Sequence, residues 1–93
     1  LIEGIKITMQ AFKQKMRSEL PKIYSQDLLN NIFRHPYTKI DFVMTELDVS
    51  RITATHYLNQ LVDIGLLMKH KIGRDNYYIN TALFDLLSNV HQK

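Results

Sequence analysis

The stretch IDFVMTELDVSRITATHYLNQLVDIG, residues 40–65, decides the fold of this chain. Apolar residues recur at helical spacing over residues 40–47 and again over residues 51–64, and only a short turn separates the two runs. Ser50 is a good N-cap, because its hydroxyl can accept a backbone N–H of the second helix, and Gly65 can take the left-handed conformation that ends it. Two helices joined by so short a turn predict a helix-turn-helix.

The apolar positions of this stretch each have a mechanical role. Val43 and Leu47 lie one turn apart and hold the first helix to the core, while Val49 fills the corner between the helices. Ala54 is small, so the two helices can approach closely. Asp48 occupies the turn position that glycine usually holds. We expect it to be left-handed, because Asp tolerates that conformation better than most residues.

A β-hairpin is predicted directly after the second helix. Two β-prone runs, residues 66–72 and 77–80, surround a Gly/Asp/Asn cluster at residues 73–76. The two tyrosines of the second run are adjacent, so one should face the core and the other should face outward. Tyr37-Thr38 follows a proline and is expected to form a short strand that pairs with the hairpin. A hairpin in this position predicts a winged helix-turn-helix.

Further helices flank this unit. Residues 1–20 carry an apolar stripe at helical spacing. A second helix extends from about Lys22 to Arg34, with Ser25 or Tyr24 near its start. Thr81 is the expected cap of a last short helix before a frayed tail at residues 88–93. The predicted fold class is α+β, mainly α: a winged helix-turn-helix with a three-helix core, a β-hairpin wing, an N-terminal connector helix and a C-terminal helix. Residues 1–20 would connect to a missing upstream domain, and residues 21–93 would form the winged helix domain.

The stripe of residues 1–20 has several possible partners. It can pack on the rest of this chain, on sequence absent from it, or on a second copy. A homodimer through residues 1–20 or 83–90 is therefore one expectation. The basic opposite side would also suit a membrane surface, but Glu3 and Glu19 disfavour that interpretation.

The candidate DNA-binding residues are the polar and apolar groups that the predicted core leaves exposed. On the second helix of the helix-turn-helix, Arg can pair with guanine, Asn with adenine, and Thr or Ile methyls with the thymine methyl. On the hairpin, cations can contact phosphates. The helix contributes Arg51, Ile52, Thr53, Thr55, His56 and Asn59, and the hairpin contributes Lys69, Lys71 and Arg74.

The charge of the chain permits a polyanion partner without requiring one. The formal net charge is +3, and each hairpin cation that neutralises a phosphate would add about 0.9 to the salt dependence of DNA binding. The same surface could instead contact protein, as an interaction or dimerisation module.

Composition also predicts several absences. There is no cysteine, so no disulfide or thiolate chemistry is available, and the histidines lack the spacing of a helical metal site. No apolar run approaches the roughly 18 residues of a membrane span. We expect a cytoplasmic protein with no cofactor, no metal and no catalytic residue.

Several motifs from Lys22 onward form a recognisable combination: FRHPYTKI (33–40), VSRITA (49–54), YL (57–58), IGLL (64–67) and GRDNYYIN (73–80). With these motifs the sequence resembles the C-terminal winged helix region of Fic-family proteins. The resemblance implies a parent enzyme that transfers AMP from ATP to protein hydroxyls. It also implies that this module lies behind a Fic catalytic domain in the same parent chain.

The catalytic motif of that family is absent from these residues. The Fic signature is His-Pro-Phe-x-Asp/Glu-Gly-Asn-Gly-Arg, and His35-Pro36-Tyr37 matches only its beginning, with no glycine-rich continuation. The family's inhibitory Ser/Thr-x-x-x-Glu-Gly/Asn helix is also missing. The chain is therefore expected to be a non-enzymatic regulatory part, which either binds DNA or positions the catalytic domain or its substrate.

Overall fold

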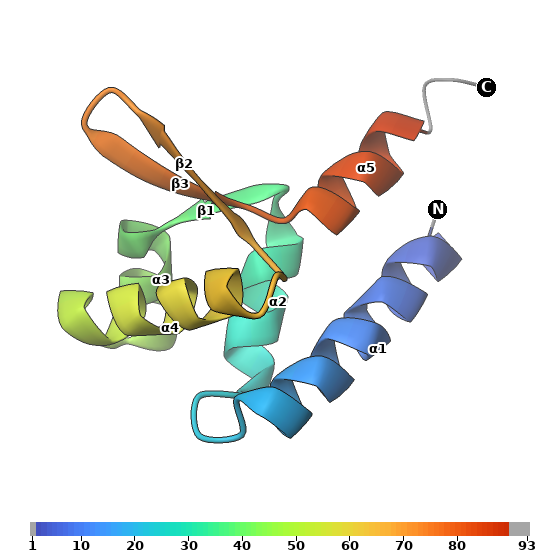
Figure 1. Ribbon diagram of the computed structural model, residues 1–93, viewed down its shortest axis with the longest axis horizontal. Helices are drawn as coiled ribbons and strands as arrows, with labels where there is room; N and C mark the ends of the chain where they lie inside the picture. Colours follow the sequence, from blue (N-terminus) through green and yellow to red (C-terminus); the bar gives the residue numbers. More distant parts are fainter. Residues whose placement is uncertain (1, 90–93) are drawn as a thin grey trace.

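The computed structural model describes residues 2–89, and over that range the chain forms five helices and three strands (Figure 1). In chain order they are α1 (Ile2–Glu19), α2 (Gln26–Arg34), β1 (Tyr37–Lys39), α3 (Ile40–Leu47), α4 (Arg51–Asp63), β2 (Met68–Ile72), β3 (Asp75–Ile79) and α5 (Thr81–Asn89). The fold is thus mainly helical α+β, with α3 and α4 in immediate succession and a hairpin after α4. This order is compatible with a winged helix-turn-helix.

The turn between α3 and α4 has the predicted chemistry. Asp48 adopts the left-handed conformation, with φ 55° and ψ 53°, and its N–H donates to the carbonyl of Met44. The Ser50 hydroxyl accepts the N–H of Thr53 at 3.2 Å, which confirms Ser50 as the N-cap of α4. At the other end of α4, Gly65 has φ 83°, and the next N–H returns to the carbonyl of Leu61 at 3.0 Å.

The three strands form one antiparallel sheet in the order β1-β3-β2, with the β2–β3 hairpin projecting from the helical body (Figure 1). The predicted pairing of the Tyr37 segment with the hairpin is confirmed, since β1 lies along β3. Gly73, with φ 63°, begins a two-residue loop, so β3 starts at Asp75, two residues earlier than predicted. The two tyrosines alternate as expected: Tyr78 is 1% exposed and Tyr77 lies on the opposite face.

Three predictions about the ends of helices were wrong. Helix α2 begins at Gln26 and not near Lys22, because the Ser25 hydroxyl caps it by accepting the N–H of Leu28 at 3.1 Å. Helix α5 is capped by Asn80 and not by Thr81, since the Asn80 Oδ1 accepts the N–H of Leu83 at 3.1 Å. The predicted frayed tail does not include residues 88 and 89, which complete α5, and residues 90–93 lie outside the described residues.

The core lies between the helices and one face of the sheet, and α1 takes part in it. Phe12 and Met16 are buried, and the Phe12 ring meets Phe33 of α2 edge to face at 4.9 Å between centroids. Helix α1 also lies beside α5 (Figure 1). A Cβ on Gly4 of α1 would lie 3.2 Å from Leu86 of α5. The stripe of α1 therefore packs on the rest of this chain.

Candidate nucleic-acid interface

Helix α4 packs one side against the core and leaves the opposite side open to solvent. Ala54, Leu58 and Leu61 are each 0% exposed against the core. On the opposite side Ile52 is 83% exposed, the largest exposed fraction among the large apolar side chains of the described chain. Arg51, His56 and Asn59 are also exposed, whereas Thr53 and Thr55 lie half-buried at the two edges of this face. All six predicted helix residues therefore reach the surface at least in part.

The one fixed positive charge of this face is paired. The Arg51 Nη2 lies 2.6 Å from the Asp41 Oδ1, and both side chains are more than half exposed. The turn brings the first turn of α3 beside the first turn of α4, so two residues ten positions apart meet. Sequence inspection missed this pair, because nothing local to Arg51 indicates it. As a result the face of α4 carries less net positive charge than its sequence suggests.

Three further polar side chains of α4, those of His56, Asn59 and Gln60, lie within hydrogen-bond distance of a neighbour. The Gln60 amide lies 2.9 Å from the His56 ring, one turn away on the same helix. The Tyr78 hydroxyl donates to the Asn59 Oδ1 across a long 3.4 Å, which links α4 to the sheet. Burial raises the pKa of Tyr78, so this phenol stays protonated as a donor.

The hairpin supplies the cations that α4 lacks. Lys69 and Lys71 alternate with the other residues of β2 and lie on the sheet face that carries Tyr78, and Lys69 extends over the Tyr78 ring at 6.0 Å from its centroid. Arg74 lies in the loop at the tip. Within residues 2–89 none of these three cations has a carboxylate oxygen within 4.0 Å, whereas Lys39 pairs with Asp75 at 3.6 Å.

The structure brings only some of the predicted residues together. Asn59 and Lys69 both contact Tyr78, so the middle of α4 and the base of the hairpin are neighbours. In the described part of the chain, no hydrogen bond or ion pair joins the hairpin cations to Arg51, Ile52, Thr53, Thr55 or His56. The candidate interface consists of two patches that meet at Tyr78.

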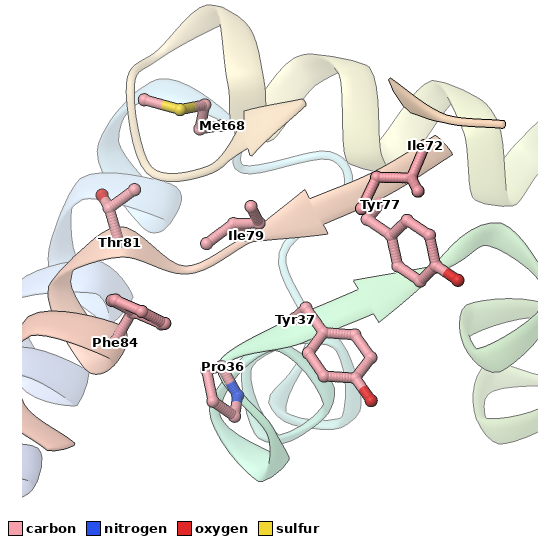
Figure 2. Close-up of a pocket in the computed structure, with 8 residues that line it drawn as sticks. All are labelled: Pro36, Tyr37, Met68, Ile72, Tyr77, Ile79, Thr81 and Phe84. Carbon is pink, nitrogen blue, oxygen red and sulfur yellow. The ribbon is translucent and has the colours of Figure 1, made fainter. Parts of the chain in front are cut away.

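The outer face of the sheet carries a groove that sequence inspection missed. It has a volume of about 640 Å³ and is lined by Pro36, Tyr37, Met68, Ile72, Tyr77, Ile79, Thr81 and Phe84. Figure 2 shows these side chains gathered on one side of the strands and the start of α5, with Ile79 in the middle. The Tyr37 and Tyr77 rings meet edge to face at 5.7 Å. The only local signal is the period of two along β2, which places Met68 and Ile72 on the face opposite to the two lysines.

Two other kinds of feature are absent from the part of the chain that the structure describes. No group of three or more His, Asp or Glu side chains in residues 2–89 could hold a metal ion. No helix of this part of the chain is long and apolar enough to cross a membrane. His35, in the motif that begins like the Fic signature, is the exposed C-cap of α2.

These features define a small α+β domain in which two consecutive helices are followed by a basic hairpin. Residues 8–83 of the sequence match the family described as the C-terminal domain of SoFic-like protein adenylyltransferases. The chain belongs to this family, which confirms the resemblance to Fic-family C-terminal regions. The match extends from the middle of α1 into α5, and it implies a catalytic domain elsewhere in the parent chain.

Proposed function

We propose that this chain is a winged helix-turn-helix that binds DNA and acts as a regulatory part of a Fic-type AMP transferase. The observation that supports the proposal most strongly is the open face of α4 followed by three hairpin cations without ion-pair partners. In this proposal α4 enters the major groove and the hairpin contacts the phosphate backbone. The chain does no chemistry itself.

The residues of α4 and the cations of the hairpin have different roles in this mode. Ile52 and Thr55 would meet thymine methyls, and Asn59 would pair with adenine. Arg51 would have to leave Asp41 before it could contact a base or a phosphate, so it contributes little attraction. Long-range attraction therefore comes from the hairpin, and three phosphate contacts predict a salt slope of about 2.7, at about 0.9 for each contact.

Fluorescence anisotropy with a labelled duplex, at about 50 mM and about 200 mM salt, tests the proposal. Replacing Lys69, Lys71 or Arg74 singly by alanine should lower the salt slope by about 0.9 in each case. Lys13→Ala on α1 is the matched control, because it removes the same charge far from the hairpin, and it should leave the slope unchanged. Absence of binding at the lower salt concentration would refute the proposal, as would equal effects of all four variants.

A protein partner on the same face of α4 is the second candidate. It is favoured by Ile52, which is 83% exposed, and by the pairing of Arg51 with Asp41, which leaves the centre of this face apolar and nearly neutral. In this alternative the domain positions the Fic catalytic domain or its substrate. Ile52→Ser would then change AMP transfer by the parent enzyme, whereas Lys71→Ala with Arg74→Ala would not.

A further inference from the structure

Strand β2 is an open edge of the sheet. In the order β1-β3-β2 it pairs with β3 on one side only, and all five of its residues are exposed. Alternate residues of an antiparallel edge strand direct their backbone N–H and C=O groups away from the sheet. These groups can accept another strand, as in other cases where an extended peptide adds to a sheet edge.

The two faces of β2 differ in chemistry. The outer face of β2 carries Met68, His70 and Ile72, of which Met68 and Ile72 line the apolar groove. Lys69 and Lys71 lie on the opposite face, which is the face of Tyr78. A strand added to this edge would alternate in the same way, because its side chains must also point to opposite faces. The edge therefore favours a ligand in which one type of side chain recurs at every second residue.

We propose that the β2 edge binds an extended peptide segment in which apolar and acidic residues alternate. Backbone hydrogen bonds to β2 would hold the segment. Its acidic side chains would lie opposite Lys69 and Lys71, and its apolar side chains would lie opposite Met68 and Ile72. Cross-strand pairs of opposite charge and of apolar residues both stabilise a sheet.

The apolar groove supports this ligand. Among the described residues seven large apolar side chains are exposed, and four of them, Tyr37, Met68, Ile72 and Phe84, line this one groove. Exposed apolar patches of this kind mark contact surfaces on soluble domains. Apolar side chains of an added strand would extend the outer face beside Met68 and Ile72 and cover part of the groove.

Charge argues against a second copy of this chain as the occupant. In the antiparallel register that pairs all five residues of two β2 strands, Lys69 of each copy lies opposite Lys71 of the other. Like charges directly opposite each other destabilise a sheet, and edge lysines are a common device against self-pairing. Both lysines lack carboxylate partners in the described chain, and an acidic strand would supply carboxylates opposite them.

The test uses the 93-residue chain and a fluorescein-labelled peptide of about eight residues that alternates valine and glutamate. We expect binding that protects the amides of Lys69 and Lys71, or those of their neighbours in β2, from hydrogen exchange. Two further peptides carry N-methyl groups on alternate residues, one on the odd-numbered and one on the even-numbered residues. Only one of these two sets of backbone N–H groups faces β2, so one peptide should lose binding and the other should keep it. A peptide that alternates valine and lysine is the charge control and should not bind.

Charge reversal gives a gain of function that misfolding cannot imitate. The variant with Lys69→Glu and Lys71→Glu should bind the valine–glutamate peptide about tenfold more weakly and should now bind the valine–lysine peptide. The proposal is overturned if both N-methylated peptides bind equally, or if the variant keeps the original preference. It is also overturned if duplex DNA or self-association, and not the peptide, protects β2. None of these peptide results depends on whether the chain binds DNA.

Discussion

Asn80→Ala is expected to destabilise this domain strongly, because the Asn80 side chain joins two helices. Its Nδ2 donates to the carbonyl of Ile32 at 2.9 Å, and its Oδ1 accepts the N–H of Leu83 at 3.1 Å. The Ile32 carbonyl lies in the last turn of α2, where its ordinary donor would be the N–H of residue 36. Residue 36 is proline and has no N–H, so Asn80 supplies the donor that α2 lacks.

The magnitude follows from these two bonds. Asn80 is 1% exposed, so its loss leaves the Ile32 carbonyl buried and unsatisfied, at a cost of about 1–3 kcal/mol. Loss of the α5 cap costs about 1 kcal/mol more. The expected decrease in the free energy of unfolding is therefore about 2–4 kcal/mol, out of the roughly 5–14 kcal/mol typical of a chain this long.

Urea unfolding followed by circular dichroism measures this decrease. Thr81→Ala is the matched control, since Thr81 is the residue that sequence inspection chose as the cap, and it should cost less than about 0.5 kcal/mol. Asn80→Ser keeps a cap oxygen but cannot reach Ile32, so it should recover about 1 kcal/mol relative to alanine. An Asn80→Ala cost below that of Thr81→Ala would refute the reasoning.

Three further predictions concern separate features. Asp48→Gly should stabilise the domain by about 0.5–1 kcal/mol, because glycine takes the left-handed conformation without steric cost, and a lower urea midpoint would contradict this. Burial raises the pKa of Tyr78 above its usual value of 10.0, so the unfolded chain loses this proton at a lower pH than the folded chain. The free energy of unfolding should therefore fall as the pH rises above about 10. Tyr78→Phe should make that fall smaller, as measured by urea unfolding at about pH 9 and about pH 11. If the chain binds DNA, Asp41→Asn should free Arg51 and raise the salt slope by about 0.9, while the remote control Asp27→Asn should not.

The segment of α3, the turn and α4 could be predicted almost entirely from the sequence, because its signals are local. Helix α3 has the predicted bounds, Ser50 caps α4, Asp48 is left-handed and Gly65 ends α4 as expected. Each of these features depends on residues within one turn of helix of each other. Propensity, capping and spacing therefore agree, and no distant contact overrides them.

Three of the features that sequence inspection missed depend on distant contacts. Thr81 is a plausible cap by residue type, but Asn80 caps α5, and its side chain is held in place by a hydrogen bond to the carbonyl of Ile32, 48 positions away in the chain. Arg51 is a free cation on a helical wheel, but the turn brings Asp41 to it. The outer groove likewise takes its lining from three strands and a helix that are adjacent only after folding.

The register of the hairpin connects the two proposed binding modes. The two-residue loop at Gly73 and the burial of Tyr78 fix which β2 residues point to each face. A slip by one residue would exchange the two lysines with Met68, His70 and Ile72. Lys69 and Lys71 are the phosphate contacts of the proposed DNA complex and also the acid contacts of the proposed strand complex. An acidic strand bound at β2 would neutralise these lysines and lower the affinity for DNA. The two ligands should therefore compete, and an acidic segment of a partner could act as a release signal for DNA.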